Sequence, residues 1–144
     1  MDVQGRLIRV LPAILLGLAL LPAWAQNDAA AEQKKMVGVW RGGWPDDKKP
    51  RYEIVITLDE ITAKNLEDGK TLGKGTYKLD PKATTLDATG TADPVKGKSY
   101  LGLYALDGDN LKWCSNNGTR KRPADLAHKP GGDQYLLVLK RQKP

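Results

Sequence analysis

From residue 37 onward, apolar and polar side chains alternate with a period of two in short runs separated by polar turns. The run 51–60 is the clearest. Glu53, Thr57 and Asp59 fall on one face. The other face carries Tyr52, Ile54, Ile56 and Leu58. Such alternation is typical of a β-strand with one buried face. About eight runs can be distinguished: 37–44, 51–60, 61–66, 72–80, 84–91, 100–106, 111–115 and 134–142.

Polar turns recur at roughly ten-residue intervals, and this spacing favours an antiparallel sandwich or barrel. Most connections are short enough to join neighbouring strands, and a closed meander buries one face without leaving sheet edges. The sequence therefore predicts an all-β domain over 37–144, an antiparallel up-and-down β-barrel of about eight strands. A short helix is predicted before it over 26–36, with Asp28 as the N-cap and Lys34 and Lys35 at its negative end.

The first 25 residues have the organisation of a signal peptide. Arg6 and Arg9 precede an apolar stretch, residues 10–21, which is too short to span a bilayer. Small residues then stand before Gln26, where a signal peptidase would cleave. We expect cleavage near Ala25, export to the periplasm or the extracellular space, and no stable membrane anchor.

Composition narrows the chemistry of the exported chain. Without residues 1–25, which contain two Arg and one Asp, the formal net charge falls from +6 to +5. A mild, dispersed positive charge gives no reason to expect a nucleic-acid partner. Cys114 is the only cysteine in the sequence, so it cannot form an intrachain disulfide or join a Cys-rich metal site. We expect no metal and no cofactor.

The sequence also gives little support for catalysis. His128 is the only histidine, so any catalytic Cys–His or Ser–His pair would have to include it. It is separated from Cys114 by an irregular segment, and we expect a loop histidine, an unpaired thiol and a protein that is not an enzyme. The densest positive cluster is Arg120, Lys121 and Arg122, which is a candidate contact for an anionic surface.

Several ordered motifs resemble one family. These are "GTYKLDP" at 75–81, "LDGDNLKWC" at 106–114, "RP" at 122–123 and "LVLKR" at 137–141. Together with the intervening sequence, they are similar to exported bacterial domains of unknown function that are abundant in planctomycetes and are described as lipocalin-like. The likeness extends from about residue 34 to the C-terminus. It implies a lipocalin-like barrel and no established activity.

A second likeness, to lipocalins themselves, rests on Gly38-Val39-Trp40. These residues stand where lipocalins carry a Gly-x-Trp signature, after a short helix and at the start of the first strand. The resemblance implies that Trp40 closes one end of the barrel and that a basic residue of the last strand, here Arg141, packs over it. A guanidinium group on an aromatic face is physically favourable.

If the alternating runs close into a barrel, their inward faces supply candidate cavity residues: Tyr52, Ile54, Tyr77, Tyr104 and Trp113. Small barrels either fill the interior with side chains or hold one small ligand. Two functions therefore stay open. The first is a binding module for a small apolar or amphipathic molecule. The second is a filled barrel that docks on an envelope protein or an anionic surface. The sequence carries no signal for the oligomeric state.

The hairpin 100–115 leads to a prediction about two adjacent residues. Trp113 falls on the inward face with Leu106 and Leu111, whereas Cys114 falls on the opposite face. We therefore expect that Trp113→Ala severely destabilises the protein and that Cys114→Ser is well tolerated.

Overall fold

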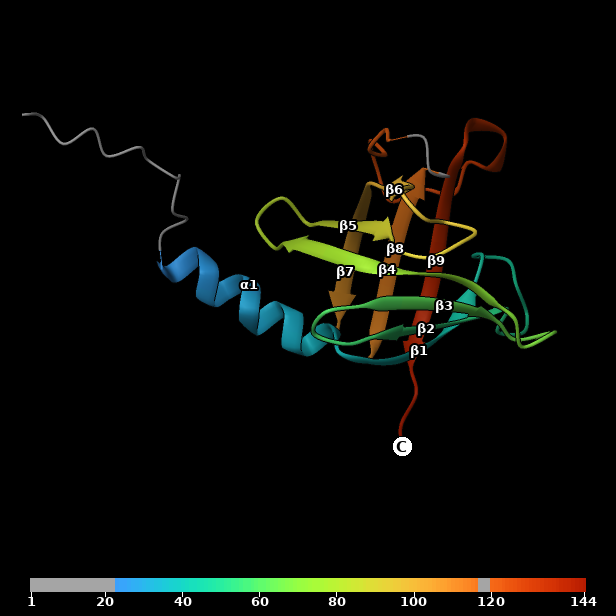
Figure 1. Cartoon of the computed structure of the whole chain (residues 1–144), viewed down its shortest axis with the longest axis horizontal. Coiled ribbons are helices and arrows are strands. Elements are labelled where there is room, and N and C mark those ends of the chain that lie inside the picture. The colour runs from blue at the N-terminus through green and yellow to red at the C-terminus, as the bar shows by residue number, and fades with distance from the viewer. Residues whose placement is uncertain (1–22, 117–119) are drawn as a thin grey trace, which may run out of the picture.

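The alternating runs form a closed antiparallel β-barrel in the computed structural model, which describes residues 23–116 and 120–144 (Figure 1). Around the barrel the strands follow the order β1–β2–β3–β4–β5–β7–β8–β9, and β9 pairs again with β1. The described elements are α1 (Ala23–Met36), β1 (Gly38–Gly43), β2 (Tyr52–Ile56), β3 (Ile61–Asn65), β4 (Thr71–Asp80), β5 (Thr85–Gly90), β6 (Ser99–Tyr100), β7 (Gly102–Asp107), β8 (Asn110–Asn116), the 3₁₀ turn η1 (Pro130–Gly132) and β9 (Gln134–Arg141).

The predicted fold class is confirmed: the described chain is an eight-stranded, lipocalin-like barrel with a short N-terminal helix. Two details differ from the sequence pattern. The strand β6 pairs alongside β5, so the predicted run 100–106 is divided at Leu101 into two strands. The second strand ends at Ile56, and Leu58 lies 54% exposed in a turn instead of on the buried face.

The helix α1 spans Ala23–Met36, where the sequence predicted 26–36. The predicted signal peptide, 1–25, lies outside the described residues except for its last three, which begin this helix. Figure 1 shows α1 extending away from the barrel, and its last turns make the contacts. Gln33 Nε2 donates to the Leu58 carbonyl, and Met36 is fully buried. None of the helices in the described part of the chain has the length and apolar character that crossing a bilayer requires.

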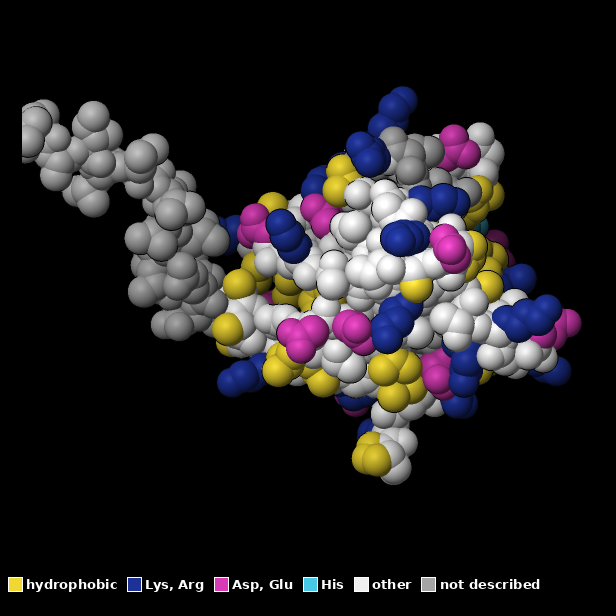
Figure 2. All heavy atoms as spheres, viewed as in Figure 1, with side chains coloured by type: hydrophobic (Ala, Val, Ile, Leu, Met, Phe, Trp, Pro, Cys, Tyr) yellow, Lys and Arg dark blue, Asp and Glu magenta, His cyan; other side chains and the backbone are white. Residues whose placement is uncertain are grey.

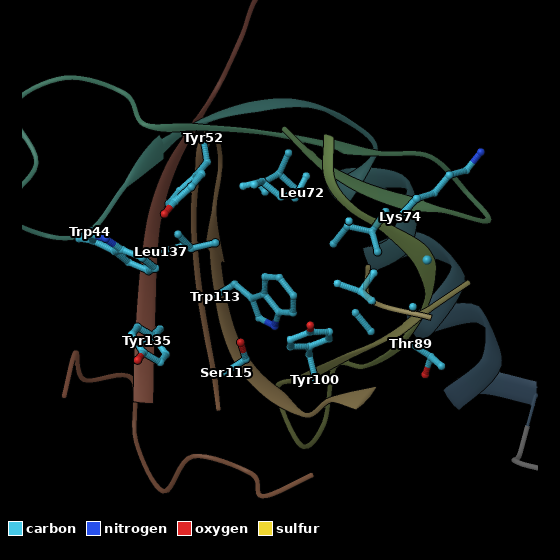
Figure 3. A pocket seen from close by; sticks show the side chains of 18 residues that line it. Trp44, Tyr52, Leu72, Lys74, Thr89, Tyr100, Trp113, Ser115, Tyr135 and Leu137 are labelled. Carbon is cyan, nitrogen blue, oxygen red and sulfur yellow. The ribbon is translucent and has the colours of Figure 1, made fainter. Parts of the chain in front are cut away.

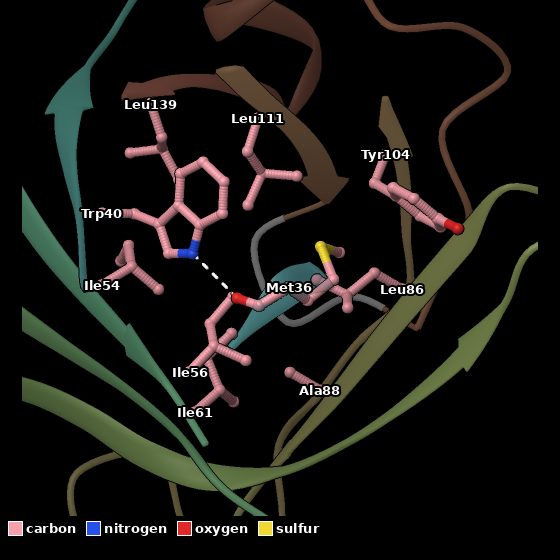
Figure 4. Packing of buried hydrophobic residues seen from close by; sticks show 10 residues of the cluster. All are labelled: Met36, Trp40, Ile54, Ile56, Ile61, Leu86, Ala88, Tyr104, Leu111 and Leu139. Atoms are coloured by element: carbon pink, nitrogen blue, oxygen red, sulfur yellow. Dashed lines mark hydrogen bonds between the residues drawn. The ribbon is translucent and has the colours of Figure 1, made fainter. Parts of the chain in front are cut away.

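The packed core fills the half of the barrel nearest α1. Its centre is Trp40, which is fully buried and donates a 2.9 Å hydrogen bond from Nε1 to the Met36 carbonyl (Figure 4). The buried apolar cluster consists of Met36, Trp40, Ile54, Ile56, Ile61, Leu86, Ala88, Tyr104, Leu111 and Leu139. The chain contains no Phe, and the cluster is built instead from Ile and Leu side chains together with one Ala, one Trp, one Tyr and one Met.

The irregular segment 120–133 is tied to the outside of the barrel by side-chain contacts, of which those of Arg122 and Gln134 are the clearest. Arg122 forms a bidentate ion pair with Asp87 on β5, with Nη1–Oδ1 and Nη2–Oδ2 distances of 2.7 and 2.8 Å. Gln134 is buried, and its Nε2 donates to the Ala127 carbonyl at 2.7 Å and to Asp125 Oδ1 at 2.8 Å. The segment therefore covers the outer face of β8.

Charged side chains are interspersed over the surface seen in Figure 2, with basic and acidic groups lying next to one another. Ion pairs such as Arg41–Glu53 and Lys74–Glu60 join neighbouring basic and acidic side chains on the surface of the barrel. On this face the mild net charge is dispersed and does not form a field of one sign.

Candidate functional site

The end of the barrel opposite Trp40 contains a cavity of about 430 Å³ that is open to solvent (Figure 3). Strand register explains its position. Trp40 pairs with Arg141 at one end of the β1–β9 ladder, and Gly43 pairs with Val138 toward the other end. Trp44 and Tyr135 lie at this second end, next to the cavity. The volume lies within the range of small-molecule binding sites, about 300–1,000 Å³.

The lining is mainly apolar and aromatic. It draws on β2, β3, β4, β5, β6, β8 and β9, on Trp44 directly after β1, and on the loop 91–98, from which Val95 contributes. The lining residues are Trp44, Tyr52, Ile54, Ile61, Ala63, Leu72, Gly73, Lys74, Gly75, Ala88, Thr89, Gly90, Val95, Tyr100, Trp113, Ser115, Tyr135 and Leu137.

An aromatic cluster forms one side of this cavity. Trp44 is its centre: the ring centroid lies 5.4 Å from that of Tyr52 in an edge contact and 5.5 Å from that of Tyr135. The imidazole of His128 stacks on the same indole, with centroids 5.2 Å apart. Asp47 accepts hydrogen bonds from the Arg51 guanidinium and from the Trp44 amide, and these bonds lower the pKa of Asp47 to about 2, the first of them most strongly. The turn that carries Trp44 is therefore well anchored.

Three of the five cavity residues that the sequence proposed line this space, namely Tyr52, Ile54 and Trp113. The other two do not belong to the lining. The Tyr77 hydroxyl donates a 2.6 Å hydrogen bond to the Thr57 carbonyl. The Tyr104 hydroxyl donates to Glu32 of α1 at 3.3 Å, and burial, followed by the neighbouring Glu32, raises the pKa of Tyr104.

Sequence reasoning missed Trp44, Tyr100 and Tyr135 as lining residues, although a signal for each existed. Trp44 continues the inward parity of Trp40, and Tyr100 has the parity of Tyr104. Tyr135 has the parity of Leu137 and Leu139 on the last strand. Alternation thus identifies the face of each residue, but it does not tell which end of the barrel the residue occupies.

Gly38, Trp40 and Arg141 form a closing corner at the other end of the barrel. The predicted stack is present, with the Arg141 guanidinium carbon 4.3 Å from the centroid of the Trp40 ring. Arg141 also donates to the Val37 carbonyl at 2.7 Å, to the Lys35 carbonyl and to Asp109. Gly38 has a φ of +151°, and a Cβ there would stand 2.6 Å from Arg141 Nη1. Only glycine leaves room for the guanidinium group.

Comparisons with protein-family models, with curated proteins and with solved structures found no match to this chain. The geometry of the barrel and the sequence pattern are therefore the basis on which a function is proposed.

Cys114 and His128 each have a structural partner. Cys114 is a free, fully buried thiol on β8 whose Sγ lies 3.5 Å from the Ala127 carbonyl, and burial raises its pKa. Since the thiolate is the reactive form, this environment disfavours nucleophilic chemistry. The Leu136 amide donates to His128 Nδ1 at 3.1 Å, which leaves the ring proton on Nε2. Among the described residues no group of three His, Cys, Asp or Glu could hold a metal ion.

The basic cluster Arg120, Lys121 and Arg122 is not uniform. Arg122 is bound to Asp87 and also donates to the Gly102 carbonyl at 2.8 Å, so it holds the segment 120–133 on the barrel. Lys121 is exposed, and its backbone carbonyl accepts a hydrogen bond from Asn116. Arg120 is exposed beside it. Of the three predicted contacts for an anionic surface, Arg120 and Lys121 are exposed, whereas Arg122 is already paired with Asp87.

Proposed function

We propose that the chain is an exported, lipocalin-like binding module that holds a small apolar or amphipathic molecule in its barrel. Export rests on the signal-peptide pattern of residues 1–25. The motifs that resemble exported lipocalin-like bacterial domains also support this proposal. The proposed function is binding alone, without catalysis.

The observation that supports ligand binding is the cavity of about 430 Å³ at the end of the barrel opposite Trp40. Protein interiors are otherwise close-packed, and an open cavity of this size leaves its apolar lining without dispersion contacts and hydrophobic burial. Its aromatic lining offers large apolar surface to a ligand, and hydroxyl groups can orient that ligand. A binding site accounts for the void, whereas a barrel that served only as a docking scaffold would gain stability from filling it.

Docking on an envelope component is the alternative that a filled barrel would have favoured. Its main support in the sequence was the basic cluster, and Arg122 of that cluster is engaged with Asp87. The cavity and this ion pair both favour the binding module.

The proposal is tested with N-phenyl-1-naphthylamine, an uncharged dye whose fluorescence rises in an apolar site. We expect saturable binding to the purified mature protein. Ala63 lines the cavity from β3, so Ala63→Phe fills part of it. Ala105 is exposed on β7, and Ala105→Phe is the matched control. Ala63→Phe should weaken dye binding by roughly tenfold or more, about 1.4 kcal/mol, while Ala105→Phe should bind like the parent.

Native mass spectrometry of protein purified from the exported fraction gives a second measurement, because a retained small molecule would identify the ligand class. Equal dye affinity in the two Phe variants, with both folded by circular dichroism, would show that the dye binds elsewhere. Absence of saturable dye binding in the parent, together with absence of a retained molecule, would contradict the proposal.

A further inference from the structure

Charged groups are almost absent from the cavity lining. Among the described lining residues, Lys74 is the one with a formally charged side chain, and none carries a carboxylate. Figure 3 shows the Lys74 side chain leading away from the cavity. Its ammonium group lies 3.4 Å from Glu60 Oε2 in a half-exposed ion pair. A charged ligand group that entered this space would lose its water without meeting an opposite charge, which is costly.

Two hydroxyl groups give the cavity a polar end. Tyr100 comes from β6 and Ser115 from β8, and Figure 3 shows both hydroxyls directed into the space below the Trp113 indole. Within the described residues neither hydroxyl has a hydrogen-bond partner in the protein. The Trp113 indole N–H differs, since it is already donated to the Leu86 carbonyl at 3.0 Å.

The hydroxyls belong to residues that are well held. Tyr100 pairs with Ala88 across the β5–β6 ladder, and Ser115 pairs with Gly102 on β7 and with Tyr135 on β9. Burial raises the pKa of Tyr100, so its hydroxyl stays a neutral donor at physiological pH. A hydroxyl group both donates and accepts, and this pair can therefore bind a ligand hydroxyl or carbonyl.

We infer that the cavity selects an uncharged, largely apolar molecule that carries a hydroxyl or carbonyl group, and that Tyr100 and Ser115 bind that group. The inference rests on the proposed function, because it specifies the ligand of the same cavity. The apolar body would pack against the aromatic and aliphatic side chains of the lining, and the polar group would lie at Tyr100 and Ser115.

Four probes with one ring system separate charge from shape: naphthalene, 2-naphthol, 2-naphthoate and 2-naphthylmethylammonium. Each is measured at pH 7 by displacement of N-phenyl-1-naphthylamine. We expect 2-naphthol to bind about three- to tenfold more tightly than naphthalene, as one net hydrogen bond allows. The anion and the cation should each bind roughly tenfold or more weakly than 2-naphthol, because their charge is desolvated without a partner.

The residues are tested with the double variant Tyr100→Phe/Ser115→Ala. It should bind naphthalene like the parent and lose the preference for 2-naphthol. Ser99 lies next to Tyr100 on β6 but does not line the cavity, so Ser99→Ala is the matched control and should keep the preference. Naphthalene binding also reports that the double variant is folded and that its cavity is intact.

The outcomes distinguish this inference from the proposed function. If the dye binds in the cavity but the four probes compete equally, the cavity binds ligands without the selectivity inferred here. If 2-naphthoate or the ammonium probe binds best, the ligand is charged and the inference is overturned. If the preference for 2-naphthol survives in the double variant, other groups bind the hydroxyl. Failure of the dye to bind the parent, together with the absence of a retained molecule in native mass spectrometry, contradicts the proposed function.

Discussion

The Trp113 indole N–H on β8 donates a 3.0 Å hydrogen bond to the Leu86 carbonyl on β5, although β7 lies between these two strands. The bond spans a weak place in the barrel, since β5 and β7 share one register pair, Thr85 with Leu103. Trp113 reaches Leu86 by passing over Gly102, where a Cβ would stand 2.3 Å from Nε1. A side chain thus replaces missing backbone pairing, and it also forms part of the cavity wall.

Gly102→Ala should therefore lower the free energy of unfolding by about 2–3 kcal/mol, because overpacking forces the indole away from Leu86. Urea denaturation measures the change. Gly131 has open space at its Cβ position, and Gly131→Ala should change stability by about 0.5 kcal/mol or less. The second substitution Trp113→Phe should remove part of the clash, so that the double variant is less destabilised than the sum of the singles. Additive effects would contradict the contact.

Trp113→Ala and Cys114→Ser should differ strongly in thermal stability. The first removes the bond to Leu86 and empties part of the barrel, at a cost of about 3 kcal/mol. The second keeps a group that can donate to the Ala127 carbonyl and should cost about 1 kcal/mol or less. Thermal melts that gave the reverse order would contradict this assignment of faces.

Arg141→Lys should weaken the closing corner without affecting the cavity. Lysine keeps the charge but loses the planar fork that contacts Trp40, Val37 and Asp109. We expect a loss of about 1–3 kcal/mol by urea denaturation and unchanged dye affinity. Arg41 is bound to Glu53 on the surface, and Arg41→Lys should cost at most about 0.5 kcal/mol. A similar loss in both variants would show that the corner has no special role.

The Arg122–Asp87 pair should make stability depend on pH. Burial alone would raise the pKa of Asp87, but hydrogen bonds from Arg122 and the Gly102 amide leave it below its usual value. Because the folded-state pKa is depressed, the pair stabilises the fold above the unfolded value of about 3.9 and loses this contribution as pH falls through the folded value.

The comparison of the parent with Asp87→Asn measures this contribution. The difference in unfolding free energy should be about 1 kcal/mol at pH 7 and should shrink below about pH 4. Asp46 is exposed in the β1–β2 loop, and Asp46→Asn should change stability little at pH 7. A difference between parent and Asp87→Asn that stayed constant down to pH 2 would contradict the assignment.

Alternation along the chain was sufficient to predict the barrel and most inward faces. Trp40, Ile54, Tyr104 and Leu111 are buried as their parity requires. The same rule failed at Leu58, because the Thr57 amide bonds to the Glu60 carbonyl and starts a turn before the apolar pattern ends. Local hydrogen bonding ended the strand there, and a residue count could not reveal it.

Only the tertiary structure determines which end of the barrel each inward-facing residue occupies. Tyr52 and Tyr104 have equivalent inward parity, yet Tyr52 lines the cavity and Tyr104 packs against Glu32 of α1. A period of two specifies the side of a strand, whereas the position along the barrel depends on the register of all the strands around the closed ring. The burial of Cys114 has the same origin, since the segment 120–133 folds back over its strand through contacts distant in the sequence.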